Sequence, residues 1–107
     1  MSFVSDDQCA KALDFQRDNA NELGRLQGRV KTLDSRLKII KAMNMGESGS
    51  VSERESHAYA SRDYREAVTE GEQDIASYTA LRALIDTAAA KVEVWRSLNA
   101  RAGRGHA

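Results

Sequence analysis

A glycine- and serine-rich stretch in the middle of the chain, residues 44–52, constrains the fold more than any other feature. Long runs of good helix formers lie on both sides of it. Proline, which would break a helix, is absent from all 107 residues. The sequence therefore predicts an all-α chain of two long helices, over about 5–43 and about 52–100, joined by a turn at about 44–51.

The charges of the two helical runs indicate how the runs pair. Formal net charge alternates in sign along the chain: −3 over residues 1–23, +5 over 24–42, −5 over 43–75 and +3 over 76–107. Folding the chain back within residues 46–49 places +5 beside −5 and −3 beside +3. Because opposite charges favour neighbouring positions on paired helices, this pattern predicts an antiparallel two-helix hairpin that resembles a coiled coil.

The first helix has an apolar seam and a signal at each end. Ser5 and Gln8 have the spacing of a capping box, and Gly46 is placed to end the helix in the left-handed conformation. Gly24 and Gly28 form a small-residue stripe, which fits either a close helix crossing or an exposed outer face. The seam follows the 3-4 spacing of a coiled coil at Leu23, Leu26, Val30, Leu33, Leu37 and Ile40.

The second helix opens with another capping box, Ser50 to Glu53, and is followed by a tail over 101–107 that we expect to be mobile. Gly71 is its weak point, and residues 61–63 can restart a helix after a kink, so three helices are the alternative. The apolar face of the second helix is wider than a single coiled-coil seam requires, and a thin hairpin encloses little core. These two features predict a dimer or higher bundle. The residues expected at that interface are Leu81, Leu84, Ile85, Val92, Trp95 and Leu98.

The composition suits one folded domain over residues 1–107. Formal net charge is zero and 41% of the residues are hydrophobic, which is typical of folded rather than disordered chains. Cys9 is the single cysteine, which excludes an internal disulfide. The N-terminus lacks the features of a signal peptide, and no apolar stretch approaches the length of a membrane span. These features predict a cytoplasmic protein without a membrane partner.

The basic residues of the first helix have two interpretations. They can form a phosphate-binding face, with Lys31 and Lys38 pointing away from the seam. They can also pair with carboxylates of the second helix, and we favour this interpretation for the arginines. The pairs expected are Arg29 with Glu66 or Glu70, and Arg36 with Asp63.

Trp95, the only tryptophan, also has two interpretations. It can stack on a nucleic-acid base while neighbouring arginines neutralise phosphates. It also continues the 3-4 apolar spacing, and we favour packing against Phe3 and Val4. The residues expected to contact single-stranded DNA, if the chain binds it, are Lys31, Lys38, Arg96, Asn99, Arg101 and Arg104.

Catalytic chemistry finds little support in the sequence. His57 lies one turn after Glu53, but two ligands without a third usually form a surface pair. Cys9 lies on an apolar stripe and is expected to be buried rather than nucleophilic. Residues 46–49 lack the lysine and the preceding strand of a phosphate-binding loop. We therefore expect no enzyme activity, metal, cofactor or small-molecule substrate.

Several short motifs in the second half are shared with a known group of proteins. They include Ser-Val-Ser-Glu-Arg-Glu at residues 50–55, Tyr-Arg-Glu-Ala at 64–67, Tyr78 with Leu81 and Arg82, and above all Val-Glu-Val-Trp-Arg-Ser-Leu-Asn-Ala at 92–100. Through them, about residues 37–101 resemble short helical proteins encoded by tailed phages and prophages, often near recombination and replication genes. The resemblance implies a phage protein that acts in the host cytoplasm, on or beside DNA metabolism.

These observations lead to three hypotheses. The first is a non-enzymatic phage accessory protein that binds single-stranded DNA, or a recombination or replication protein. The second is an inhibitor that binds a host defence or regulatory protein, with acidic residues 53–74 as a contact surface. The third is a small assembly or scaffolding component. Salt-sensitive DNA binding separates the first hypothesis from the others.

Overall fold

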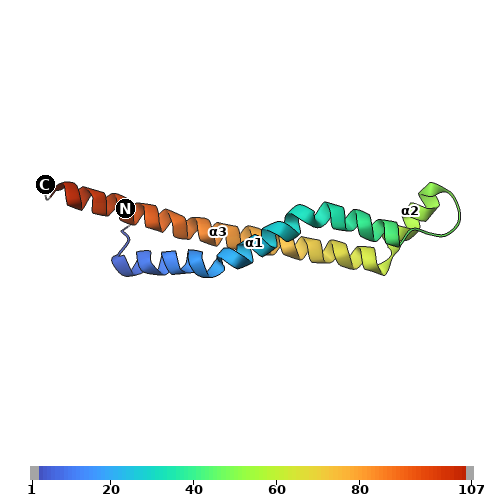
Figure 1. Cartoon of the computed structure of the whole chain (residues 1–107), viewed down its shortest axis with the longest axis horizontal. Coiled ribbons are helices and arrows are strands. Elements are labelled where there is room, and N and C mark those ends of the chain that lie inside the picture. The colour runs from blue at the N-terminus through green and yellow to red at the C-terminus, as the bar shows by residue number, and fades with distance from the viewer. Residues whose placement is uncertain (1–2, 106–107) are drawn as a thin grey trace. The chain divides into compact units, whose positions relative to one another are not determined.

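The computed structural model describes residues 3–105, with the side-chain surroundings of residues 3–102. Within this part of the chain the structure consists of three α-helices and contains no strand: α1 (Asp6–Met43), α2 (Val51–Ala60) and α3 (Arg62–Gly105) (Figure 1). The prediction of an all-α protein is confirmed. The chain divides into two compact units, which we call unit 1 (Met1–Gly24 and Thr79–Ala107) and unit 2 (Arg25–Tyr78).

The predicted capping box at Ser5 is complete, whereas at Ser50 only the bond from the Glu53 N–H to the cap hydroxyl follows the predicted pattern. At the start of α1, the Gln8 N–H donates to Ser5 Oγ at 3.1 Å, and the Ser5 N–H donates to Gln8 Oε1 at 2.9 Å. At the start of α2, the Glu53 N–H donates to Ser50 Oγ at 3.1 Å, and the Ser50 hydroxyl donates to Glu53 Oε1. These bonds satisfy amide groups that have no partner within the helix itself.

The turn between α1 and α2 differs from the expectation at Gly46. Among the described residues, positive φ occurs at Gly49 (+98°), so the prediction of a left-handed Gly46 is wrong. Gly46 instead pairs with α2: its N–H donates to the Arg54 carbonyl at 3.2 Å, and its carbonyl accepts from Arg54 Nε at 2.8 Å. A Cβ added at Gly46 would lie 3.3 Å from the Cβ of His57. Glycine therefore suits position 46 because the chain passes close to His57, not because the backbone is left-handed there.

The expected second helix is divided at Ser61 into α2 and α3. Ser61 has extended backbone angles (φ −64°, ψ 150°), and its hydroxyl donates to the Ala58 carbonyl and accepts from the Tyr64 N–H. The three-helix alternative is therefore the one found, because the Ser61 side chain ends one helix and caps the next. The expected weak point, Gly71, lies inside a continuous α3.

Helix α3 also continues further than expected. It reaches Gly105, so residues 101–105 are helical where the sequence predicted a mobile tail. Residues 106 and 107 of that predicted tail lie outside the described part of the chain.

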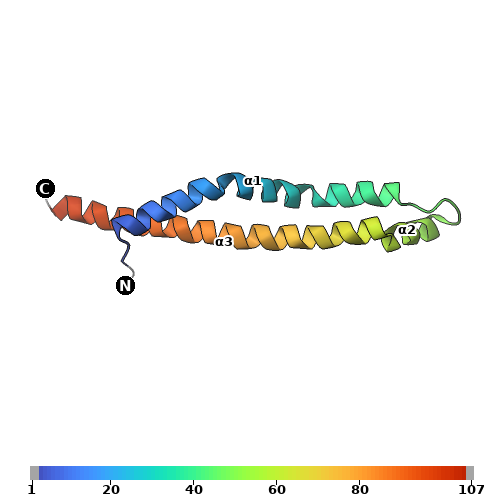
Figure 2. The same ribbon diagram turned by 90° about the horizontal axis from the view of Figure 1, so that it is seen from below.

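Unit 1 joins the first part of α1 to the last part of α3, which run antiparallel beside each other (Figure 2). Trp95 Nε1 donates to Asp6 Oδ1 at 2.8 Å and so ties the start of α1 to the C-terminal part of α3. The core consists mainly of small side chains, with Phe15, Val94 and Trp95 packed against it. Its buried members are Val4, Cys9, Ala12, Ala88 and Val92.

Unit 2 joins the second part of α1 to α2 and the first part of α3. Its buried residues include Leu26, Ala58 and Ala67. Gly71 lies against Leu33, whose Cδ1 would be 2.6 Å from a Cβ added at that glycine. By contrast, Gly28 has open space where its Cβ would be, as does Gly24 in unit 1. The close helix approach therefore occurs at Gly71, and the Gly24–Gly28 stripe lies on the outside.

Candidate functional site

The basic residues of unit 2 pair with acidic residues of α3 and α2, but not in the predicted register. Arg29 Nε donates to Asp74 Oδ2 at 2.8 Å, and an Arg36 terminal nitrogen lies 3.9 Å from the same oxygen. The predicted partners Glu66, Glu70 and Asp63 are wrong. The reason is that Asp74 is the half-buried carboxylate on the α1 side of α3, whereas Glu66 pairs with Arg62 within α3.

Not every hydrogen-bond donor in the cluster of Arg29, Arg36 and Asp74 has a partner. An Arg36 terminal nitrogen donates to the Arg29 carbonyl at 2.6 Å, which ties two turns of α1 together. Arg36 Nε is buried and has no hydrogen-bond partner among the described residues. A buried donor left unpaired costs about 1–3 kcal/mol, so the cluster holds the helices in register more than it stabilises them.

Lys41 forms the other cross-helix contact of unit 2. Its Nζ lies 3.5 Å from Glu55 Oε1 and 4.9 Å from the centre of the Tyr59 ring. The Tyr59 ring also meets Tyr64 edge-to-face, with centroids 5.2 Å apart. Contact with the Tyr59 side chain, followed by the charge of Glu55, raises the pKa of Lys41 above its ordinary value. These side chains anchor α2 to the end of α1.

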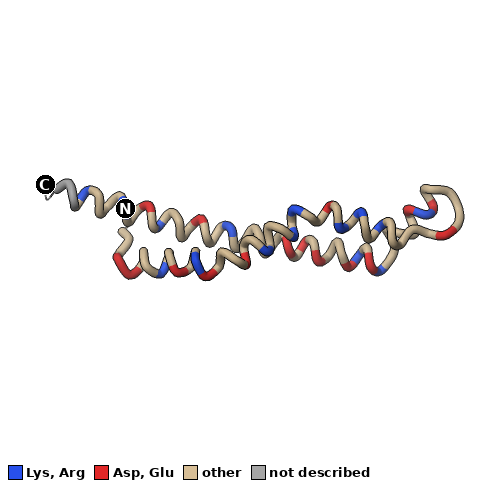
Figure 3. The backbone as a smooth tube through the Cα atoms, in the orientation of Figure 1, with Lys and Arg blue, Asp and Glu red and all other residues tan. Residues whose placement is uncertain are grey.

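The residues expected to contact nucleic acid fall in both units. Figure 3 shows basic residues along α1 in unit 2, and acidic residues prevail on the facing part of α3. Lys31 and Lys38 belong to unit 2, and the other four belong to unit 1. Several are already engaged: Lys38 pairs with Asp34 at 3.1 Å, Arg96 with Glu93 at 2.9 Å, and Asn99 Nδ2 donates to the Trp95 carbonyl. Lys31 and Arg101 are exposed, and the side chain of Arg104 lies outside the described residues.

Trp95 contributes to the core of unit 1. Its ring is partly buried against the apolar cluster, and its N–H is bonded to Asp6, so the favoured packing interpretation agrees with the structure. Val4 is buried in the same cluster, as expected. Phe3 differs, because 73% of its surface is exposed.

The six residues expected at an oligomer interface have different surroundings. Val92 is buried in the core of unit 1, and Trp95 packs against that core. Leu81, Ile85 and Leu98 are partly buried. Leu84 has 56% of its surface exposed and is therefore available for contact with another molecule.

Leu84 lies at the edge of a hollow between the two helices of unit 1. The hollow has a volume of about 270 Å³. Ala12, Phe15 and Ala88 supply apolar surface, while a lysine from each helix, Lys11 and Lys91, supplies positive charge. The residues that line it are Gln8, Lys11, Ala12 and Phe15 from α1, and Leu84, Thr87, Ala88 and Lys91 from α3.

A second hollow of about 410 Å³ shares Gln8, Thr87 and Lys91 with the first, and it adds Phe3, Val4, Ala90 and Val94. We call the two together the unit 1 groove. Its small residues, Ala12 and Ala88, make the space between the helices, and Phe15 and Leu84 border it. Leu84 was predicted from the sequence as an interface residue. That Lys11 and Lys91 line the same groove was not predicted, because only the folded helices bring these two lysines together.

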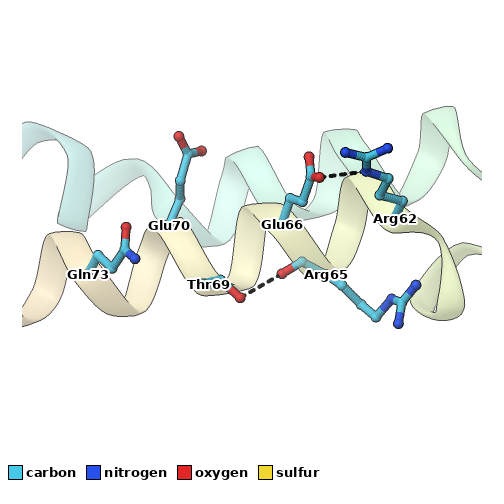
Figure 4. Close-up of a pocket in the computed structure, with 6 residues that line it drawn as sticks. All are labelled: Arg62, Arg65, Glu66, Thr69, Glu70 and Gln73. Atoms are coloured by element: carbon cyan, nitrogen blue, oxygen red, sulfur yellow. Dashed lines mark hydrogen bonds and ion pairs between the residues drawn. The ribbon is translucent and has the colours of Figure 1, made fainter.

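Another hollow, of about 480 Å³, lies along α3 in unit 2 (Figure 4). All six side chains that line it come from the same helix, and Arg62 Nε donates to Glu66 Oε1 at 2.7 Å. This hydrogen bond raises the pKa of Arg62. The lining carries two arginines and two glutamates, so it has no formal charge excess. A one-helix face with balanced charges is typical of a solvated surface. The lining residues are Arg62, Arg65, Glu66, Thr69, Glu70 and Gln73.

The described residues contain no group of three or more histidine, cysteine, aspartate or glutamate side chains that could hold a metal ion. Glu53, the expected neighbour of His57, is engaged with Ser50 at the cap of α2. Cys9 is buried in the core of unit 1, as expected. None of the described helices has both the length and the apolarity needed to cross a membrane.

The unit 1 groove thus combines apolar surface with two exposed lysines, of which Lys11 pairs with Asp7 at 3.0 Å. Clefts of this kind between paired helices accept an amphipathic helix. No protein-family model, curated protein or solved structure matches the chain.

Proposed function

We propose that this chain is a non-enzymatic helical interaction protein, and that its unit 1 groove binds an amphipathic helix of a protein partner. The observation that carries this proposal is the groove itself: apolar side chains between Lys11 and Lys91, with the exposed Leu84 at its border. A helix with apolar anchors and acidic flanking residues complements that surface. The proposal includes the antiparallel pairing of the long helices and their assembly into a larger bundle.

The distribution of charge favours a protein partner over direct binding to DNA. Residues 25–78 of unit 2 carry nine basic and nine acidic side chains, and the two segments of unit 1 carry seven of each. Neither unit therefore has the charge excess that draws proteins to phosphates. The arginines of α1 nearest to the seam, Arg29 and Arg36, are turned toward Asp74. Trp95 is engaged with Asp6 and the core instead of standing free for a base.

The resemblance of about residues 37–101 to phage and prophage proteins supports a role in DNA metabolism within the host cytoplasm. We propose that the partner is a recombination or replication protein. The alternative is that the same groove binds a host defence or regulatory protein, which the chain thereby inhibits.

Photo-crosslinking from the groove tests the proposal. A photoreactive amino acid replaces Thr87, which lines the groove, and in a control it replaces Ala83, which is exposed on the same helix but does not line it. Illumination in host cells should yield a defined crosslinked polypeptide from position 87 and much less from position 83. Equal crosslinking from both positions would contradict the proposal.

Single-stranded DNA is the second candidate ligand, favoured by the exposure of Lys31, Lys38 and Arg101. Titration of labelled oligonucleotides at low and near-physiological salt, followed by anisotropy and Trp95 fluorescence, tests it. We expect no saturable binding. Tight binding that weakens steeply with salt would overturn our preference for a protein ligand.

A further inference from the structure

A further hollow of about 480 Å³ continues the unit 1 groove toward the start of α1 and the C-terminal part of α3. We call it the end hollow. It shares Phe3 and Val4 with the adjoining hollow of the groove, so the two lie next to each other. Resting on the function proposed above, we infer that the end hollow receives a basic side chain of the partner helix, and that this contact fixes the direction in which the helix lies.

The charges that line this surface change sign along it. Among the described residues, the first hollow of the groove is lined by Lys11 and Lys91 and by no carboxylate, whereas the end hollow is lined by Asp6 and Asp7 and by no basic residue. Lys11 and Asp7 pair with each other at 3.0 Å, with both side chains more than 70% exposed. This pair leaves a positive charge at Lys91 and a negative charge at Asp6. The positive end of the α1 dipole, equivalent to about half an elementary charge, offsets only part of the charge of Asp6.

The walls of the end hollow suit a basic side chain. Asp6 accepts a hydrogen bond from the neutral Trp95 Nε1–H at 2.8 Å, and this bond holds the indole ring beside the carboxylate. A carboxylate next to an indole ring attracts a cation, because the carboxylate supplies the opposite charge and the face of the ring supplies a cation–π contact. Leu98 and the exposed Phe3 add apolar surface for the methylene groups of an arginine or lysine.

The order of these charges selects one direction for the partner helix. Helices favour acidic residues in their first turn and basic residues in their last turn, because of the helix dipole. Such a helix places its N-terminal end over Lys91 and its C-terminal end over Asp6. It therefore runs parallel to α3 and antiparallel to the facing part of α1, which can be followed in Figure 2. A helix with acidic residues at both ends would bring like charges together at Asp6.

The length of the surface indicates the length of the partner helix. The lining residues of α3 extend from Leu84 in the groove to Asn99 in the end hollow. At a rise of 1.5 Å per residue, this part of α3 is roughly 22 Å long. A partner helix of about four turns covers it.

Two synthetic peptides test the contact with the end hollow. Each forms a helix of about four turns, with leucines along one face and glutamates in its first turn. One peptide has arginines in its last turn, and the other has glutamines there. Fluorescence anisotropy at low salt should show that the full chain binds the arginine peptide at least about threefold more tightly. Equal affinities, or no binding of either peptide, would overturn the inference.

Two carboxylate variants assign this preference to the end hollow. Asp6→Asn keeps an oxygen that can accept from Trp95 but removes the charge. Asp14→Asn removes an exposed carboxylate of α1 that pairs with Arg17 and does not line the hollow. The preference for the arginine peptide should be lost in Asp6→Asn and kept in Asp14→Asn. Loss in both variants would show that only the total charge of the chain matters, and would overturn the assignment.

A photoreactive group on the arginine peptide tests the direction without any change to the chain. From the first turn of the peptide, the group should attach to residues 8–15 or 84–91. From the last turn, it should attach to residues 3–7 or 95–99. Mass spectrometry of the crosslinked fragments identifies the sites, and exchanged sites would overturn the proposed direction.

Failure of this inference is distinguishable from failure of the proposed function, which is measured by crosslinking from position 87 in host cells. A defined crosslinked partner, together with peptides that show no charge preference, keeps the function and overturns the inference. Equal crosslinking from positions 87 and 83 overturns the proposed function, and with it the partner helix on which the inference rests.

Discussion

Unit 1 joins its helices mainly through apolar side chains, whereas unit 2 adds charged groups and a close approach at glycine to its buried apolar residues. In unit 1 the small core lies beside one polar bond, from Trp95 to Asp6. In unit 2 a half-buried aspartate, Asp74, holds two arginines, and Gly71 lets Leu33 approach α3.

This difference explains why the two units suit different roles. Charged groups with directional bonds fix the register of a helix pair but contribute little net stability. Apolar packing of small residues is less directional and leaves a groove that another helix can fill. We therefore assign register to unit 2 and the interaction surface to unit 1.

The largest effect should follow from removing Asp74. Asp74→Ala leaves two partly buried arginines without a carboxylate and should lower the free energy of unfolding by about 2 kcal/mol. Asp86→Ala, which removes an exposed ion pair in unit 1, should cost no more than about 0.5 kcal/mol. Urea denaturation measures both variants. Equal losses would show that Asp74 is no more important than a surface carboxylate.

Shortening Val92 should lower the free energy of unfolding by slightly less than the removal of Asp74 does. Val92 is 5% exposed, so Val92→Ala leaves a cavity and should cost about 1.5 kcal/mol, independent of salt. Val51→Ala removes the same atoms from an exposed position in unit 2 and should change the stability by no more than about 0.5 kcal/mol. A strong salt dependence of the Val92 effect would contradict the apolar description of unit 1.

Two glycine substitutions within unit 2 should have opposite signs. Gly28→Ala meets open space and should stabilise the protein by about 1 kcal/mol through helix propensity. Gly71→Ala gains the same propensity but forces its Cβ against Leu33, so we expect a net loss of about 1 kcal/mol. Thermal unfolding compares them. If both alanines stabilise equally, Leu33 moves aside easily and the close approach is unimportant.

The smallest effect should come from the titration of Lys41. Its pKa in the folded protein is raised above the ordinary 10.5 by Tyr59 and Glu55, so its contribution to stability is fully present below about pH 10. The contribution is lost as pH rises through the folded pKa. Denaturation of the wild type and of Lys41→Gln should therefore give a constant difference from neutral pH to about pH 10 and a shrinking one above it. A difference that disappears near pH 8 would contradict this assignment.

Helix type and helix starts were predictable because they depend on local signals. Ser5 with Gln8 forms both bonds that the spacing predicts, and Ser50 with Glu53 forms one of the two. The kink was harder to place because Gly71 and Ser61 were both plausible breakers. The structure uses the side chain of Ser61 as a cap and buries Gly71 in a helix contact.

Cross-helix partners and the groove were harder to predict because they depend on the rotation of one helix against another. The net charges of the segments indicated which parts of the helices attract each other. The rotation of α3 about its own axis decides whether Asp74 or Glu70 faces Arg29. The groove depends on Ala12 and Ala88 meeting across unit 1, and no periodicity in the sequence marks this contact.

Hydrogen–deuterium exchange of the chain alone and bound to the partner that crosslinks from position 87 tests the assignment of the interaction surface to unit 1 most directly. We predict that binding slows exchange for peptides covering residues 8–15 and 84–91, which line the groove, while peptides of unit 2 stay unchanged. Slower exchange confined to unit 2, or no change in either unit on binding, would contradict the account.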